Sequence, residues 1–292
     1  MLTIGTFDGV HIGHKKIIDR LTSSALAEGL QSVVLTFFPH PRMVLQQNSE
    51  IKLLNTIEEK QQLLEQIGLD TLIIHPFDKT FSELSAEEFV KNILIEKLNI
   101  KKIIIGYDHR FGKNRSAGIE DLVIFGAKYS FEVEQIPAQE IEEVSVSSTK
   151  IRKALDDGNI TLANSYLGYN YFFNASVIEG KKLGRTIGFP TANLKVSETY
   201  KLIPKIGVYV VEGVVEGQKL KGMMNIGFRP TVDGTSLSIE VHFFDFSENI
   251  YGKYLQISVI EKIRDEQKFE SVEALKNQLD QDKIFALGYF TS

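Results

Sequence analysis

Two histidines stand three residues apart near the start of the sequence, in the stretch GTFDGVHIGH (5–14). Histidines with this spacing lie on one face of the first turn of a helix, and their ring N–H groups can bind phosphate. The N-terminus of a helix also presents free backbone amides and a partial positive charge to an anion. His11 and His14 therefore predict a phosphate site after the first strand, suited to a triphosphate.

The same stretch could instead be a structural histidine pair, a metal pair or a different nucleotide motif. The sequence has no cysteine and no evident third ligand beside the histidines, which disfavours zinc. The dinucleotide fingerprint GxGxxG is absent, because the glycines of the stretch do not have that spacing. A phosphate-binding loop is also disfavoured, since GYDHRFGKN (106–114) has its glycines one residue too far apart and no Ser or Thr after its lysine.

A second stretch, SSTKIR (147–152), places hydroxyl side chains before a helix that carries basic residues. By itself it could be a simple N-cap, because Ser and Thr side chains accept hydrogen bonds from the first helical amides. Its occurrence together with the histidine pair, at the other end of one α/β domain, favours a nucleotide-binding role.

A third stretch, EGKKLGRTIGFPTANL (179–194), combines glycines, three basic side chains and a Pro-Thr-x-Asn turn. Glycine lets the backbone approach a phosphate, and Lys and Arg supply compensating charge. Thr191 and Asn193 are neutral oxygen ligands that could hold a magnesium ion on a nucleotide. The alternative is a glycine-rich hairpin in which Pro190 fixes a turn, and the residue types alone leave both interpretations open. In the first interpretation, the phosphate contacts are Gly180, Lys182, Gly184 and Arg185.

One carboxylate of the second half could also face a site. In SIEVHFFDF (238–246), alternation with a period of two puts Ile239 and Val241 on one face and Glu240 on the other. An acidic strand residue usually belongs to a solvated face. Its place after the Pro-Thr-x-Asn turn instead favours a role in the site.

The elements that would position these residues differ between the two halves. The first half alternates continuous apolar runs with amphipathic stretches, which is typical of a Rossmann-like parallel sheet covered by helices on both faces. The apolar runs are LTIGTF (2–7), SVVLTF (32–37), TLIIHPF (71–77), KIIIGY (102–107) and FEVEQI (131–136). Ligands of such sheets bind outside the carboxyl ends of the strands, where the histidine stretch falls.

From about Tyr169 the strands alternate and are separated by glycines, which indicates a mainly antiparallel β-barrel or a β-sandwich. The clearest strands are GVYVVEGVVEG (207–217), SIEVHFFDF (238–246) and YLQISVI (254–260). A helix follows at 271–282, which we interpret as packing and lid support, with Ser271 as its N-cap. The sequence therefore predicts two domains, residues 1–168 and 169–292.

Composition narrows the partners and the compartment. The chain has 292 residues and a formal net charge of -5, so it has no basic field for nucleic acid or a membrane surface. Without cysteine it can form neither a disulfide nor a thiol nucleophile. No run of about 18 apolar residues and no signal-like N-terminal segment are present. We expect a cytoplasmic protein with small-molecule substrates, and the sequence leaves its oligomeric state open.

The stretch GTFDGVHIGH resembles the HxGH signature of the nucleotidylyltransferase superfamily, and SSTKIR resembles its companion motif. The resemblance implies that both motifs hold ATP while an anionic oxygen attacks the α-phosphorus and pyrophosphate leaves. Such a reaction depends on positioning and on charge stabilisation. It gives His11 and His14 catalytic roles. The ATP contacts that it implies are Gly5, Phe7, Asp8, Gly13, Ser147, Ser148, Thr149 and Arg152.

The stretch GRTIGFPTANL resembles the PTAN motif of riboflavin kinases, which is followed by a strand glutamate and by a pattern matched here from Tyr251 to Phe269. Together with the HxGH domain, this arrangement resembles the bifunctional riboflavin kinase/FMN adenylyltransferase (FAD synthetase) family over nearly the whole chain. The resemblance implies that the C-terminal domain phosphorylates riboflavin to FMN with Mg2+ and ATP, with Glu240 as general base. It also implies that the N-terminal domain converts FMN to FAD.

The same resemblance implies flavin contacts in both halves. They lie in TFFPHPR (36–42), GYDHRFG (106–112) and the IRDEQKF stretch (263–269). The implied residues are Phe37, Pro39, Asp108, Arg110, Phe111, Arg264 and Glu266. Two further functions stay open: a riboflavin kinase with weak or different nucleotidylyltransferase activity, and a flavin-binding regulator without turnover.

Overall fold

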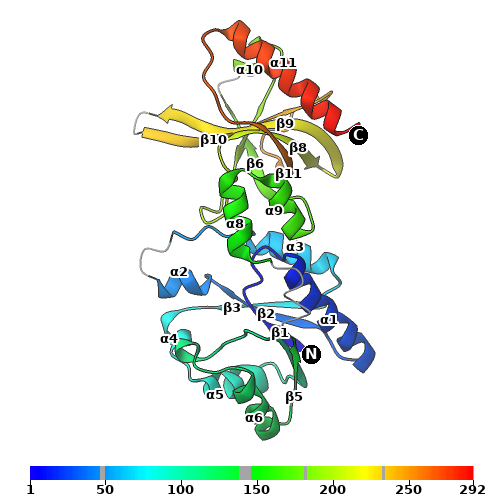
Figure 1. The fold of residues 1–292 in the computed structure, drawn as a ribbon, viewed down its shortest axis with the longest axis vertical. Helices are drawn as coiled ribbons and strands as arrows, with labels where there is room; N and C mark the ends of the chain where they lie inside the picture. The colour runs from blue at the N-terminus through cyan, green and yellow to red at the C-terminus, as the bar shows by residue number, and fades with distance from the viewer. Residues whose placement is uncertain (47–49, 138–145, 181–182, 232–233, 292) are drawn as a thin grey trace. The chain divides into compact units, whose positions relative to one another are not determined.

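A computed structural model describes residues 1–46, 50–137, 146–180, 183–231 and 234–291. The chain forms two compact units, Met1–Ser148 and Thr149–Ser292. Figure 1 shows the helices and strands of both units, coloured from blue at the N-terminus to red at the C-terminus.

The first unit contains a five-stranded parallel sheet with the order β3-β2-β1-β4-β5. Its strands are β1 (Leu2–Ile4), β2 (Val33–Phe38), β3 (Thr71–Pro76), β4 (Lys102–Gly106) and β5 (Glu132–Ile136). The chain moves outward from β1 to β2 and β3, and then returns to β4 on the other side of β1. The carboxyl end of β1 is thus the point at which the strand order reverses, which is where open α/β sheets bind their ligands.

Helices of the first unit connect these strands. They are α1 (Ile12–Glu28), α2 (Pro41–Leu45), α3 (Ile57–Gln66), α4 (Lys79–Ser82), α5 (Ala86–Phe89), the π-helical η1 (Val90–Ile95), the 3-10 helix η2 (Lys113–Arg115) and α6 (Ile119–Tyr129). One apolar core lies between η1, α6 and alternate sheet residues such as Leu35 and Ile103. Helix α1 contacts β1 and β4, and the neighbouring residues Val34 and Ile104 are also buried. Alternate strand residues point to opposite faces, so both faces of the sheet are covered, as predicted.

The second unit contains a closed barrel with the order β10-β7-β6-β11-β8-β9, in which all neighbouring strands are antiparallel. Its elements are α8 (Ser148–Asp157), α9 (Ile160–Leu167), β6 (Phe172–Ile178), α10 (Leu183–Thr186), β7 (Ala192–Lys195), β8 (Gly207–Val215), β9 (Gln218–Thr231), β10 (Gly234–Phe243), β11 (Tyr254–Arg264) and α11 (Val272–Tyr289). The predicted α/β domain, antiparallel barrel and terminal helix are confirmed.

Two helices that the sequence analysis placed in the first domain, α8 and α9, group with the barrel. Asn164 on α9 donates from Nδ2 to the Val259 carbonyl on β11 at 3.0 Å, and Lys205 N donates to the Leu155 carbonyl on α8 at 3.1 Å. The contact division accordingly falls after Ser148. A domain boundary between residues 168 and 169 stays a prediction.

Two candidate active sites

The turn between β1 and α1 carries the histidine pair and has an unusual backbone. Phe7 and Val10 have positive φ angles of 44° and 35°, and Gly9 has a φ of 88°. A Cβ atom placed on Gly5 would lie 2.9 Å from the Phe7 ring, so the ring lies directly against the backbone there. Left-handed conformations at residues other than glycine cost free energy and persist where the surroundings enforce them.

His11 is the N-cap of α1, and its Nδ1 accepts a hydrogen bond from the His14 backbone N–H at 3.3 Å. The two imidazole rings are stacked, with 3.6 Å between their centroids and 16° between their planes. The Phe7 and His14 rings form a T-shaped pair, with 5.1 Å between their centroids. This arrangement fixes both rings at the N-terminus of α1, where the backbone amides point outward.

Both histidines are neutral at pH 7. Burial lowers the pKa of His11 to about 4, because an imidazolium ion loses its hydration there. Burial also holds the pKa of His14 well below its usual value, with smaller contributions from His11 and Lys60. His14 Nδ1 is buried and has no hydrogen-bond partner within the part of the chain that the structure describes. A neutral, incompletely bonded ring can donate to or accept from a nucleotide.

Asp8 joins the turn to two other segments. Its Oδ1 accepts hydrogen bonds from the backbone N–H groups of Leu54 at 2.9 Å and Asn55 at 3.4 Å. Its carbonyl accepts a hydrogen bond from Ser148 Oγ at 2.8 Å. The structure therefore brings the start of SSTKIR to the histidine turn and uses the Asp8 carboxylate within the protein. A direct ATP contact of Asp8 stays a prediction.

The other predicted ATP contacts of this site are placed as follows. A Cβ atom on Gly13 would lie 3.3 Å from the His11 ring, so the histidine packs against its backbone. Ser147 and Ser148 belong to the first unit, whereas Thr149 and Arg152 belong to the second. Ser147 and Thr149 are exposed, and Arg152 is half-buried.

The predicted flavin contacts of the first unit lie after β2 and β4, the two neighbours of β1. Phe37, at the end of β2, packs its ring against Phe77 and Phe81, with 5.7 and 5.5 Å between the ring centroids. Pro39 follows a cis peptide bond and is exposed. These residues share the carboxyl edge of the sheet with the histidine turn.

The residues after β4 divide between surface and core. Asp108 and Arg110 are exposed, and the Arg110 guanidinium lies over Gly118, where a Cβ atom would be 2.8 Å from its Nη1. Phe111 is buried within the apolar core of the unit. Its packing there gives it a structural role, and its flavin contact stays a prediction.

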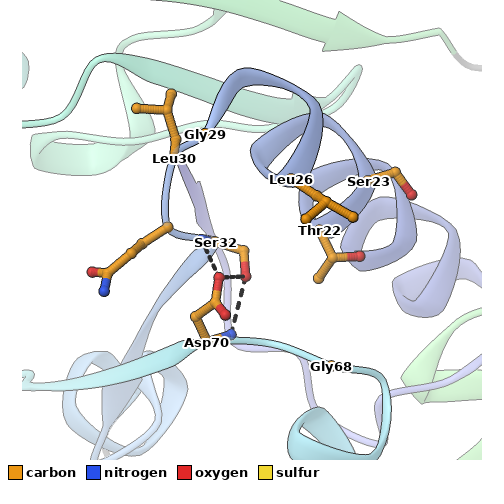
Figure 2. A pocket seen from close by; sticks show the side chains of 9 residues that line it. Thr22, Ser23, Leu26, Gly29, Leu30, Ser32, Gly68 and Asp70 are labelled. Atoms are coloured by element: carbon orange, nitrogen blue, oxygen red, sulfur yellow. Dashed lines mark hydrogen bonds between the residues drawn. The ribbon is translucent and has the colours of Figure 1, made fainter.

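A hollow of about 410 Å³ lies elsewhere on this unit and is shown in Figure 2. At its wall, Asp70 Oδ2 accepts hydrogen bonds from the backbone N–H and hydroxyl of Ser32 at 2.8 and 2.7 Å. Ser32 and Asp70 precede β2 and β3, so the hollow lies at the amino ends of the strands. It is at the opposite edge of the sheet from the histidines and adds nothing to their site.

The barrel carries the second site around Glu240 on β10. Its Oε2 accepts a hydrogen bond from Thr191 Oγ1 at 3.0 Å, and its Oε1 accepts one from Ser238 Oγ at 3.4 Å. In the strand register, Glu240 stands opposite Asn193 on β7 and Asn225 on β9. Directly opposed residues share a face, so the carboxylate lies between two amides and beside a hydroxyl group.

The glycine-rich stretch approaches this cluster closely. A Cβ atom on Gly180 would lie 2.0 Å from Asn193 Nδ2, so no larger residue fits there. A Cβ atom on Gly184 would lie 2.1 Å from the Phe189 carbonyl oxygen. Arg185 donates from Nη2 to the Tyr251 hydroxyl at 3.4 Å. Lys182, another predicted phosphate contact, lies outside the described residues.

The predicted flavin contacts of the barrel, Arg264 and Glu266, are near its rim. Arg264 binds the buried carboxylate of Asp282 on α11 through Nε at 3.0 and 3.1 Å and through Nη2 at 2.8 Å. Glu266 lies against Gly227, where a Cβ atom would be 2.0 Å from its Oε1. The pairing of Arg264 with Asp282 holds the guanidinium in place, and its flavin contact stays a prediction.

Several residues of these sites were missed by sequence reasoning: Lys60, Asn225 and Asp282. Lys60 directly follows Glu59, which forms a capping box with Thr56, and the residue types of this box are a signal that the sequence offered. Asn225 and Asp282 have no local signal, since their partners come from other strands or from another element.

The predicted Pro-Thr-x-Asn turn is instead the entry to strand β7, which begins at Ala192. An HxGH turn on a parallel sheet, followed by a PTAN motif at the start of a barrel strand, defines a two-domain enzyme that transfers phosphorus-containing groups. The family model described as FAD synthetase matches residues 1–150, and the one described as riboflavin kinase matches residues 167–290. The chain belongs to the bifunctional riboflavin kinase/FMN adenylyltransferase family. Its two activities are therefore riboflavin kinase and FMN adenylyltransferase, as predicted.

Similar proteins span nearly the whole chain. A bifunctional riboflavin kinase/FMN adenylyltransferase of Listeria monocytogenes is 41% identical and is matched over 99% of this chain and 92% of its own length. The protein of the same name from Escherichia coli K12 is 37% identical, with the same shares covered. A solved structure titled "Crystal Structure of Macrolide-efflux Protein from Streptococcus pneumoniae" has a TM-score of 0.88 and 34% identity, and covers 98% of this chain and 93% of its own. Among the described residues, no helix is long and apolar enough to span a membrane.

Proposed function

We propose that the barrel performs the kinase reaction with Glu240 as its general base. The terminal ribityl hydroxyl oxygen of riboflavin forms a bond to the γ-phosphorus of ATP, the bond from that phosphorus to the bridging oxygen breaks, and ADP leaves. Glu240 accepts the hydroxyl proton. The observation that carries this role is the position of the carboxylate, which Thr191 and Ser238 orient by hydrogen bonds at 3.0 and 3.4 Å.

The residues beside Glu240 fit a magnesium ion carried by ATP. Thr191 and Asn193 offer a hydroxyl and an amide oxygen beside a carboxylate, and oxygen ligands of this kind suit Mg2+. A bound ion would neutralise charge on the transferring phosphoryl group. Gly180 and Gly184 let Asn193 and the Phe189 carbonyl approach the backbone, and Arg185 would supply positive charge to the phosphates.

In the first unit, the proposed reaction joins FMN to the adenylyl group of ATP. A phosphate oxygen of FMN forms a bond to the α-phosphorus, the bond to the bridging oxygen breaks, and pyrophosphate leaves. His11, His14 and the amides of the first turn of α1 would hold the phosphates and stabilise the charge that develops on them. No proton needs to leave the attacking phosphate group, which agrees with the neutral state of both histidines.

The test is to incubate the purified chain with riboflavin, Mg2+ and ATP and to separate the flavins by chromatography. Formation of both FMN and FAD supports the proposal. FMN alone identifies a kinase with weak or different nucleotidylyltransferase activity, and neither product identifies a flavin-binding regulator. We also propose that the reactions take place in the cytoplasm, which is consistent with a chain that has no cysteine.

A further inference from the structure

Lys60 is a buried cation that the proposed reactions do not use. It lies on α3, and the residue is 5% exposed. Its Nζ donates to the Thr6 carbonyl at 2.6 Å and lies 3.5 Å from Thr36 Oγ1. A buried ammonium group is costly unless its surroundings compensate it, so its presence here requires a physical reason.

The partner of Lys60 belongs to the histidine turn. Thr6 precedes Phe7, the first residue of that turn with a positive φ. On the other side of Phe7, the Asp8 carboxylate binds the backbone N–H groups of Leu54 and Asn55. The segment that leads into α3 and the lysine on that helix thus hold the strained turn at two points. Such a backbone needs this support to keep its shape.

The charged groups around Lys60 define its electrostatic effect. Asp8 on the turn is an acidic neighbour that raises the pKa of Lys60, while burial lowers it more strongly, to about 8. The positive charge of Lys60 contributes to the lowered pKa of His14 on α1. Glu59, beside Lys60 on α3, is bonded within the capping box to Thr56. At pH 7 the lysine is therefore charged and lies behind the proposed triphosphate site.

We propose that Lys60 is a positioning residue for adenylyl transfer, which holds the Thr6 carbonyl and supplies positive charge behind the histidine turn. The inference rests on the proposed function of the first unit. Lys60 acts through the turn and touches no reacting atom. Both the position of His11 and His14 and the attraction of the triphosphate then depend on its charge.

The test compares three variants of the full chain. K60M keeps much of the side-chain volume and removes the charge, K60R keeps the charge, and K97M changes an exposed lysine elsewhere in the unit. Formation of FAD from FMN and ATP is measured as kcat and KM, and riboflavin phosphorylation by the same samples serves as an internal control. Thermal unfolding is followed for each variant.

We expect K60M to lower kcat/KM for ATP in FAD formation by about 10²-fold, with riboflavin phosphorylation unchanged within about twofold. K60R should recover at least about a tenth of the wild-type value, and K97M should match the wild type. If K60M keeps more than about a third of the wild-type value, the inference is overturned.

The pH dependence of kcat/KM for ATP distinguishes the proposed role from a purely structural one, because a lysine with only a structural role would not affect it. In the free enzyme, Lys60 loses its proton above pH about 8, so kcat/KM for ATP should fall there in the wild type. Arginine stays charged, so K60R should move this fall to higher pH. If kcat/KM for ATP falls at the same alkaline pH in the wild type and in K60R, the inference is overturned. This comparison does not need K60M, so it holds even if that variant does not fold. A wild type that forms no FAD overturns the proposed function and the inference together.

Discussion

At the scale of single residues, the histidine pair gives the sharpest separation of the two activities. We expect His14→Ala to lower FAD formation from FMN by about 10²-fold or more, because the proposed role of the ring is to stabilise developing phosphate charge. Riboflavin phosphorylation should stay within about twofold of wild type, since Glu240 and its partners lie on the barrel. Both rates are measured separately on one preparation. Equal loss of both would contradict two separate sites.

The buried histidines also make stability depend on pH. His11 has a pKa of about 4 in the folded protein against an ordinary value of 6.5. Between these values the unfolded chain binds protons that the folded chain does not, so the free energy of unfolding falls as the pH falls from 6.5 to 4. The contribution of one such histidine has a slope of at most about 1.4 kcal/mol per pH unit. Denaturant unfolding of wild type and His11→Gln should show a shallower pH dependence in the variant; parallel curves would contradict this assignment.

Glu240→Gln keeps the size of the side chain and most of its hydrogen bonding but cannot accept the proton. General-base removal costs about 10²- to 10⁴-fold, and phosphoryl transfer needs little early deprotonation, so we expect a loss near 10²-fold in riboflavin phosphorylation. FAD formation from supplied FMN should stay close to wild type. The measurement is the initial rate of each step with folded protein. A loss of less than about fivefold would make Glu240 only a strand residue.

The site residues that could be predicted from the sequence are those whose partners lie only a few residues away in the chain. His11 and His14 lie within one helical turn, and Thr191 and Asn193 lie two residues apart at the start of β7, so spacing alone indicates a shared site. Lys60 comes from a different helix, and its partner is a backbone carbonyl. Backbone groups carry no sequence signal, so such a residue becomes visible only in three dimensions.

At the scale of elements, the five apolar runs predicted the parallel strands. The reason is clearest for the central strands β1, β2 and β4, because a strand buried on both faces must be continuously apolar, whereas the edge strands β3 and β5 are partly exposed. Strand β9 was not singled out, because glycines interrupt its alternation. The structure explains both glycines: a Cβ atom would lie 2.6 Å from the His242 carbonyl oxygen at Gly222 and 2.0 Å from Glu266 Oε1 at Gly227. Glycine in a strand marks this kind of close approach, whose partner the sequence does not identify.

Helix α11 is predicted to provide packing and lid support, and its ion pair allows a test of that role. Asp282 binds Arg264 through both carboxylate oxygens, and Gln278 Nε2 donates to Oδ1 at 3.0 Å. We expect Asp282→Ala to destabilise the barrel unit by about 3 kcal/mol, because it leaves the guanidinium without its buried partner. It should also raise KM for riboflavin more than it lowers kcat, since Arg264 is a predicted flavin contact. The control is Asp280→Ala, an exposed acid on the same helix.

Denaturant unfolding and steady-state phosphorylation rates check this prediction. Loss of stability with an unchanged KM for riboflavin would leave Asp282 a purely structural residue. Similar effects of Asp280→Ala and Asp282→Ala would show that net charge on the helix matters more than the pair.

At the scale of the whole molecule, each proposed site has hydrogen bonds from within its own unit. Thr191 and Ser238 hold Glu240, whereas Leu54, Asn55 and Ser148 hold Asp8. Loss of one site should therefore leave the groups of the other in place. FMN is the product of riboflavin phosphorylation and the substrate of adenylyl transfer, so we expect FMN released into solution by one site to reach the other by diffusion.

Two chains that each lack one activity should accordingly complement each other. His14→Ala should convert riboflavin to FMN and stop, and Glu240→Gln should convert FMN to FAD but start slowly from riboflavin. In a mixture of the two with riboflavin, Mg2+ and ATP, we expect FAD to form after a lag, because FMN must first accumulate to the KM of the adenylyltransferase site. Chromatography at successive times gives the lag and the final rate, with each variant alone and the wild type as controls. FAD no higher than the sum of the separate variants would contradict free exchange of FMN and would indicate that one chain passes it directly between its own sites.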